Sequence, residues 1–360
     1  MGVVAFTRAR DRLLALDARE PTATEVCDAI VEAFHAVARF DHCAVMTTDP
    51  QTHLPSGGTV QGFAPEDCGP FWDNELADPD FNKFSDLARR VDPVATLHET
   101  VDGELSRSPR FSRLYATFGV GDELRVAFVA GTSCLAVGVF LRPAEDGPFT
   151  AGELTDVRAL VPVATTVLRH AHGRIMAESS VEPPVVLVLD GEGAVIAMSA
   201  GGQALLDDLR VDEIDGDVPS LVQVAAAKVR STRTATSLTT QVRSRSGRWL
   251  RLHVTPMEGD PDRVAVTVDT ARPDDLARIL LDSYGLTPRE TEIVLALCRG
   301  MSTKEIASEL TISAHTVRDH LKAIYEKAGV SSRGELVAGL FSNHVLDRMH
   351  ETVTHLGVPS

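Results

Sequence analysis

The stretch that decides the fold reads LTPRETEIVLALCRGMSTKEIASELTISAHTVRDHLKAIYEKAGVSSRGELV and runs from Leu286 to Val337. It contains four helix starts, each marked by a serine or threonine whose side chain can accept a hydrogen bond from the first turn. In three of them a glutamate follows three positions later, which completes a capping box. The four caps are Thr287, Ser302, Ser313 and Ser332. We therefore predict four helices in this stretch.

The second and third of these helices are joined by a very short turn, because only Thr311 and Ile312 lie between them. On the third helix, apolar residues recur at helical spacing and form one continuous stripe. The stripe consists of Val317, Leu321, Ile324 and Ala328. A short helix, a tight turn and a longer amphipathic helix are the arrangement of a helix-turn-helix.

The opposite face of the third helix is polar. It carries His315, Arg318, Asp319 and Lys322, with Thr316, His320 and Lys327 at its edges. Arginine can bind guanine with two hydrogen bonds, lysine can reach a base edge or a phosphate, and amides at a helix N-terminus can hold a phosphate. The face is therefore typical of a surface that enters the major groove of DNA.

The whole stretch resembles the LuxR-type DNA-binding domain at nearly every signature position. The matching residues are Leu286 to Glu290, Glu292, Gly300 to Ala307, Ile312, Ser313, Thr316, Val317, His320, Leu321, Ile324, Tyr325, Lys327 and Gly329 to Val337. The resemblance covers about sixty of 360 residues. It implies a four-helix domain of a transcriptional regulator.

The resemblance also implies roles for single residues. Base edges would be approached by Arg318, Asp319 and Lys322, and phosphates by Lys304, Thr316 and Lys327. With the cap and its neighbour added, we predict that DNA is contacted by Lys304, Ser313, His315, Thr316, Arg318, Asp319, Lys322 and Lys327. The fourth helix would pair two copies through Leu336, Val337 and Leu340.

The first part of the chain, residues 8–177, mixes helical and strand-like patterns. An amphipathic helix is predicted around residues 26–37, a strand at 42–48, and a hairpin of residues 123–129 and 134–141 turned at Gly131. Thr150 and Glu153 form a capping box that starts a further helix. This segment resembles a GAF domain.

A polar, proline-bearing linker is predicted at 178–184, and a second α+β segment follows at 185–270. It has a hairpin at 185–198, helical patterns at 200–209 and 221–229, and strands at 237–243, 248–255 and 264–268. The segment resembles a PAS domain. No internal repeat is visible between the two segments.

The predicted fold class is multidomain: an α+β GAF-like domain, an α+β PAS-like domain and an all-α four-helix domain. Residues 271–283 would form a second linker, 284–343 the helix-turn-helix domain and 344–360 a tail. We expect the upstream domains to sense a signal or to hold a homodimer together.

The net charge of −16, from 35 Lys and Arg against 51 Asp and Glu, by itself argues against a partner that is a polyanion. The charge is uneven, however. Residues 280–343 hold seven cationic and eight anionic side chains, so the predicted DNA-binding domain is nearly neutral. This predicts modest non-specific affinity for DNA and reliance on pairing of two copies.

The remaining patterns bound the protein class. The five cysteines, Cys27, Cys43, Cys68, Cys134 and Cys298, are scattered without metal-ligand spacing, which favours a reducing cytoplasm and no metal. We predict no cofactor, no membrane segment and no catalytic function, because no nucleophile, metal or nucleotide-binding motif is present.

Two functions other than DNA-binding regulation stay open at this level. The helical domain could bind a protein, which would make the chain a partner-binding adaptor; an enzyme is a distant third. Trp72 with Phe71, Phe81 and Phe84 could line a ligand pocket or pack in a core, and Trp249 has the same ambiguity. Double-stranded DNA is the predicted partner; an unknown small molecule and RNA polymerase are further candidates.

Overall fold

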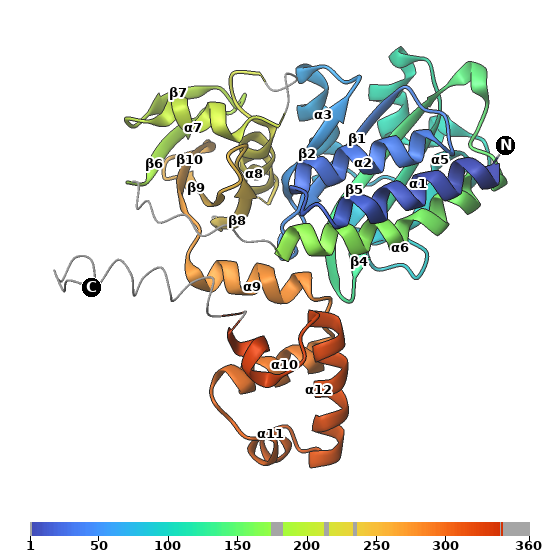
Figure 1. Cartoon of the computed structure of the whole chain (residues 1–360). Coiled ribbons are helices and arrows are strands. Elements are labelled where there is room, and N and C mark those ends of the chain that lie inside the picture. Colours follow the sequence, from blue (N-terminus) through green and yellow to red (C-terminus); the bar gives the residue numbers. More distant parts are fainter. Residues whose placement is uncertain (1, 174–182, 212–215, 233–235, 339, 341–360) are drawn as a thin grey trace.

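The computed structural model describes residues 2–173, 183–211, 216–232, 236–338 and 340. Two antiparallel five-stranded sheets lie side by side, and a helical domain projects from the side where they meet (Figure 1). Most of the predicted linker 178–184 and the whole predicted tail 344–360 fall outside the described residues. Among the helices that are described, none has the length and apolar character needed to cross a membrane.

The first sheet has the strand order β2-β1-β5-β4-β3. Its strands are β1 (His42–Thr48), β2 (Pro55–Gln61), β3 (Val94–Thr96), β4 (Val120–Ala130) and β5 (Ser133–Pro143). The predicted hairpin is confirmed: β4 and β5 pair with Ala130 opposite Ser133, and Gly131 adopts a φ of +62° in the turn. Glycine takes this left-handed conformation without the clash that a β-carbon would cause.

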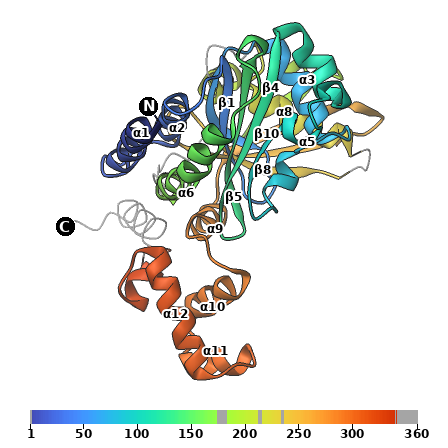
Figure 2. The ribbon, with the colours of Figure 1, turned by 90° about the vertical axis from the view of Figure 1, so that its right-hand side faces the viewer.

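Helices cover both faces of this sheet (Figure 2). One face packs against α1 (Gly2–Asp17), α2 (Ala23–His35) and α6 (Ala151–Gly173). The other packs against α3 (Pro65–Leu76), α4 (Phe84–Leu87), α5 (Leu97–Thr100) and the short turns η1 (Leu105–Arg107), η2 (Phe111–Tyr115) and η3 (Ala116–Phe118). The turn η4 (Ala144–Asp146) follows β5, and its Asp146 pairs with Arg39, which follows α2. The predicted start of α6 is confirmed, since Thr150 and Glu153 form their capping box.

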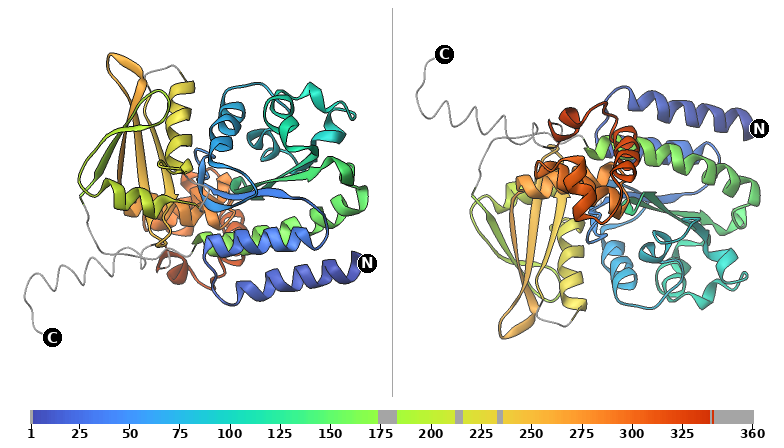
Figure 3. Two further views of the ribbon diagram at one scale, coloured as in Figure 1. Left: turned by 90° about the horizontal axis from the view of Figure 1, so that it is seen from above. Right: turned by 90° about the horizontal axis from the view of Figure 1, so that it is seen from below.

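The second sheet has the order β7-β6-β10-β9-β8, which repeats the order of the first sheet. Its strands are β6 (Val185–Leu189), β7 (Val195–Met198), β8 (Leu238–Arg243), β9 (Trp249–Met257) and β10 (Asp260–Thr270). Its helices α7 (Gly202–Leu209) and α8 (Ser220–Ser231) pack on one face only. Seen from above, α8 lies between the second sheet and the first domain (Figure 3), and a single apolar cluster includes buried side chains from both sheets.

Residues 271–283, predicted as a linker, form helix α9 (Pro273–Ser283). The apolar side chains of Ile279 and Leu280 are buried in the same cluster as the core of the helical domain, which explains why the segment is helical and not extended. Trp249 of β9 also belongs to this cluster and is 4% exposed, so it is a core residue. The helical domain follows with α10 (Pro288–Cys298), α11 (Thr303–Glu309), α12 (Ala314–Ala328) and helical residues at 333–338.

Candidate nucleic-acid interface

The predicted helix caps are present in the helical domain. Thr287 accepts a hydrogen bond from the Glu290 amide, and the Glu290 carboxylate accepts one from the Thr287 amide at 2.7 Å. Ser302 and Glu305 repeat this arrangement at α11. Ser313 Oγ accepts from the Thr316 amide at 3.0 Å and so begins α12. Each cap satisfies amides that a helix start would otherwise leave unpaired.

The turn between α11 and α12 is tight because Thr311 adopts a φ of +56°. This conformation is costly for a β-branched residue. The chain then returns at once, with the Ile312 amide donating to the carbonyl of Ala307 at 3.0 Å. The predicted stripe packs inward from α12: Val317, Leu321 and Ile324 are buried. The helix-turn-helix predicted from the caps is therefore confirmed.

The opposite face of α12 is open to solvent. Arg318, Lys322, His315, Asp319 and the cap Ser313 are exposed, and Thr316 and His320 are half-buried. Asp319 accepts a hydrogen bond from His315 Nδ1 at 2.9 Å, one turn apart on the helix. Lys304 on α11 is exposed as well. Figure 1 shows α11 and the adjoining end of α12 at the end of the helical domain farthest from the sheets.

Lys327, predicted to contact phosphate, has a protein partner in this structure. Its ammonium donates to Glu290 Oε2 at 2.6 Å, and its side chain is 33% exposed. Burial would raise the pKa of Glu290, but the hydrogen bonds from Lys327 and Thr287 outweigh it and lower that pKa. Lys327 also lines a cleft of about 730 Å³ beside Arg158 and Arg169 of the first domain. A phosphate contact by Lys327 stays a prediction, and it would use a donor of the ammonium other than the one bonded to Glu290.

The residues predicted to pair two copies lie partly inside the domain. Leu336 and Leu340 are 0% and 3% exposed and belong to the core of the helical domain, because the fourth helix must bury its apolar side against α10 and α12. Val337 is half-buried. Of the three, only Val337 keeps surface for a second copy in this conformation.

The β4–β5 hairpin of the first sheet contacts the segment that leads into the helical domain, a junction that no sequence pattern predicted. At the tip of the β4–β5 hairpin, a β-carbon added to Gly131 would lie 2.5 Å from the carbonyl oxygen of Gly285, just before α10. Ser133, on the same hairpin, donates to Asp282 of α9. These residues are some 150 positions apart, so no local pattern could have linked them.

A second set of contacts joins the sheets to each other. The buried carboxylate of Asp49, after β1, accepts hydrogen bonds from Thr240 Oγ1 at 2.9 Å and from the Gln241 amide at 3.1 Å, both on β8. The side chain of Gln241 donates in turn to Asp275 of α9. The segment that leads into the helical domain thus contacts both sheets.

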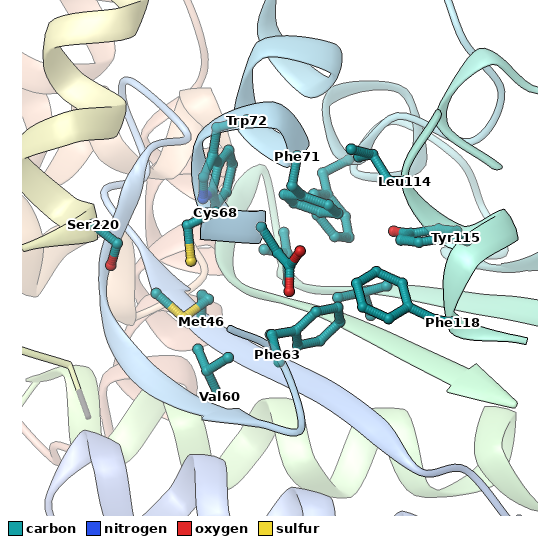
Figure 4. A pocket seen from close by; sticks show the side chains of 15 residues that line it. Met46, Val60, Phe63, Cys68, Phe71, Trp72, Leu114, Tyr115, Phe118 and Ser220 are labelled. Atoms are coloured by element: carbon teal, nitrogen blue, oxygen red, sulfur yellow. The ribbon is translucent and has the colours of Figure 1, made fainter. Parts of the chain in front are cut away.

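The first domain contains an apolar cavity of about 50 Å³ between its sheet and α3 (Figure 4). Trp72, Phe71 and Phe84 line it, in keeping with the pocket alternative, whereas Phe81 does not and lies against Arg107 instead. Ser220, the first residue of α8, contributes a wall from the second domain. Sequence reasoning missed Ser220 because only the packing of the two sheets brings it here.

Behind the cavity lies a network of fully buried charges. The carboxylate of Glu123 accepts hydrogen bonds from Arg110, Arg125 and Tyr115, at 2.7 to 3.1 Å. Burial alone would raise the pKa of Glu123, but the two guanidinium groups outweigh it and hold that pKa below its usual value. Arg125 also lies over the ring of Phe84, 4.4 Å from its centre.

The sequence of the helical domain matches a known protein family. Residues 284–339 match the family described as bacterial regulatory proteins, luxR family. The spore germination protein GerE of Bacillus subtilis is 47% identical over 55 residues, which is 15% of this chain and 74% of GerE. The chain belongs to the LuxR family. It is a DNA-binding transcriptional regulator and not an enzyme.

Two further relatives match over different shares of their length. The probable transcriptional regulatory protein SgaR of Hyphomicrobium methylovorum is 29% identical over 183 residues, 42% of this chain and 82% of SgaR. The probable regulator GfsR of Streptomyces halstedii is 45% identical over 53 residues, so the match spans 15% of this chain and 22% of GfsR.

Solved structures are similar only at a distance. SdiA in complex with octanoyl-rac-glycerol is 14% identical with a TM-score of 0.31, and 93% of each chain is covered. A phage VqmA–DPO complex is 19% identical with a TM-score of 0.25, over 45% of this chain and 83% of that one.

Proposed function

We propose that two copies of this LuxR-type regulator read a roughly two-fold DNA site by placing α12 in the major groove. The observation that carries the proposal is the open polar face of α12, where Arg318 and Lys322 are exposed opposite the buried stripe. In this position, arginine and lysine can reach base edges. Lys304 on α11, and Thr316 and Lys327 on α12, are assigned to phosphates, and Ser313 and His315 are proposed as further DNA contacts.

Pairing of the two copies is assigned to the fourth helix, where Val337 keeps surface for a partner. The near-neutral charge of the helical domain supports this assignment, because a domain without a strong positive charge gains affinity and specificity from binding two half-sites at once. Asp319 is assigned to cytosine, because a carboxylate can accept a hydrogen bond from the cytosine amino group, and only its Oδ2 atom is bonded to His315.

The upstream regions are assigned as a GAF-like domain at 8–177 and a PAS-like domain at 185–270, followed by the DNA-binding domain at 284–343. The five-stranded antiparallel sheets and their shared strand order support this assignment. We infer that a small molecule bound by these domains gates DNA binding. The contacts of Gly131 with Gly285, and of Gln241 with Asp275, support it because they give both sheets a direct contact with the segment that carries the DNA-binding domain.

The test is genome-wide mapping of bound sites, followed by fluorescence anisotropy on the recovered DNA. We expect half-sites with centres about 10 base pairs apart, one helical turn. Arg318→Ala/Lys322→Ala should weaken binding at least about tenfold, since each base contact contributes about 1–3 kcal/mol. The salt dependence should also become shallower if Lys322 neutralises a phosphate.

The matched control is Arg12→Ala/Arg263→Ala, which removes the same charge from exposed arginines on α1 and β10. It should bind DNA like the wild type. If both double variants bind DNA equally well at every salt concentration, the assignment of Arg318 and Lys322 to DNA is wrong.

A further inference from the structure

The cavity of the first domain has a composition that restricts its ligand. Strand residues of β1, β2 and β5 form its floor, and aromatic side chains form its walls, among them Phe63, Phe71, Trp72 and Phe118 (Figure 4). Such apolar cavities with few polar groups are where proteins bind small molecules. Asp67 is the one charged side chain among the described residues that line it.

Only one of the two carboxylate oxygens of Asp67 has a hydrogen-bond partner among the described residues. Its Oδ2 atom accepts the Ala64 amide at 2.8 Å and so caps α3. Its Oδ1 atom has no hydrogen-bond partner among the residues that the structure describes. A carboxylate oxygen beside aromatic walls gains most from a hydrogen-bond donor, because a donor replaces the water that a ligand would displace. A carboxylate or phosphate ligand would meet like charge.

The size of the cavity sets a further limit. At about 50 Å³ it is roughly one-third of the ~150 Å³ cavity that holds benzene. Phe63, Phe71, Leu114 and Phe118 are only half-buried, so the rim can move outward to admit a benzene-sized group. Two fused rings or a long acyl chain would require a larger displacement of these side chains and so should bind less tightly.

We propose that this cavity binds a compact, largely apolar molecule whose one polar group is a hydrogen-bond donor, a hydroxyl or a protonated amine, directed at Oδ1 of Asp67. The inference rests on the proposed function, in which the upstream domains sense a small molecule. Because Ser220 of α8 lines the same cavity, the ligand touches both domains at once. Displacement of the cavity walls by a ligand would therefore act directly on α8, which packs on the second sheet.

The test uses four probes of one shape on the full-length chain, followed by calorimetry and ligand-observed NMR. Benzyl alcohol and benzylammonium carry a donor, whereas benzyl methyl ether carries only an acceptor and benzoate carries a negative charge. We expect the two donors to bind about ten- to a hundredfold more tightly than the other two, as for one hydrogen bond to a charged group. The larger 2-naphthylmethanol should bind more weakly than benzyl alcohol.

Asp67→Asn gives the decisive comparison, because it can keep the cap of α3 while an amide NH₂ replaces the free oxygen. The preference should invert: benzyl methyl ether should gain affinity and benzylammonium should lose it. This gain cannot arise from unfolding. Asp73→Asn, an exposed carboxylate on the same helix, is the matched control and should keep the wild-type preference.

Three results would overturn the proposal: no probe binds, benzoate binds best, or Asp67→Asn leaves the preference unchanged. The same samples are tested for DNA binding. If DNA binding keeps its dependence on Arg318 and Lys322 while the probes fail, only the cavity assignment falls. If that dependence is absent, the proposed function falls whatever the probes do.

Discussion

The two sheets share one strand order and yet are built in different ways. In both, the first strand lies between the second and the fifth, and the fourth lies between the fifth and the third. Helices cover both faces of the first sheet, and its interior holds fully buried ions. Helices α7 and α8 cover one face of the second sheet, whereas on its strands Val186 and Ile196 are 38% and 47% exposed and only the end of β9, at Trp249, is buried with α9. The same strand order thus occurs in a domain whose sheet is covered on both faces and in one whose sheet is largely exposed on one face.

The buried ions should mark the largest difference between the sheets. Glu123→Ala leaves Arg110 and Arg125 buried without their shared partner, which should cost about 3–5 kcal/mol. Asp269→Ala in the second sheet breaks a partly exposed pair with Arg251, 2.6 Å apart, and should cost about 1 kcal/mol or less. Urea unfolding followed by circular dichroism measures both. Equal costs would show that burial does not distinguish the two pairs.

The contact between the first sheet and α9, at Ser133 and Asp282, should make the free energy of unfolding depend on pH. Burial raises the pKa of Asp282 to about 6, with a smaller contribution from Asp49 in the same direction. The folded state therefore holds a proton that the unfolded chain releases near pH 4, so stability falls as pH rises from about 4 to about 6 and stays lower above. Asp282→Asn should remove this loss and raise stability at pH 7.5 by up to about 3 kcal/mol.

Thermal unfolding of the wild type and Asp282→Asn across pH 4 to 8 checks this sign. The two proteins should differ most above pH 6 and converge near pH 4, where the carboxyl group of the wild type is protonated. A constant difference at all pH values would mean that the substitution acts through packing and not through the charge of Asp282.

One substitution in the first strand of each sheet tests how the exposure of a strand residue changes the cost of adding a hydroxyl group. Val45 of β1 is fully buried, so Val45→Thr places a hydroxyl in an apolar core and should cost about 1–3 kcal/mol. Val186→Thr on β6 exposes its hydroxyl to water and should change stability by about 0.5 kcal/mol at most. Chemical denaturation measures both. A cost at Val186 as large as that at Val45 would show that the exposure of Val186 does not lessen the effect of the hydroxyl.

The hairpins between the fourth and fifth strands give the smallest test. Gly131 and Gly259 both have positive φ, +62° and +85°, but only Gly131 faces another segment, the backbone of Gly285. Alanine carries the same type of backbone strain at both sites. Gly131→Ala should therefore cost about 1–2 kcal/mol more than Gly259→Ala, because its methyl group must displace Gly285. Comparing the two melting curves isolates the contact with the DNA-binding domain.

Local patterns were sufficient for the elements that depend on neighbours in the sequence. The capping boxes of Thr287 and Ser302, the hairpin of β4 and β5 and the strands of the second sheet are all present as expected. Helix α9 was missed because its charged first turn and proline-bearing start resemble a linker. The spacing of Leu276, Ile279 and Leu280 was the signal that could have identified it.

Local patterns predicted the exposure of some site residues, whereas the contacts of others depend on tertiary packing. The exposure of Arg318 and Lys322 follows from the period of the α-helix, which places them opposite Val317 and Leu321. The partner of Lys327 could not be predicted, because Glu290 lies 37 positions away and is brought close by packing of α10 against α12.

By itself, the sequence determined the helix-turn-helix and its polar face, since caps, turn and apolar stripe are all encoded within some fifty consecutive residues. It also determined that two α+β segments precede this domain. Only the tertiary structure decided which charges are buried together, that one cavity is walled by both domains, and that Gly131 meets Gly285. Those features depend on contacts between residues far apart in the chain, whose burial depends on how the two sheets pack.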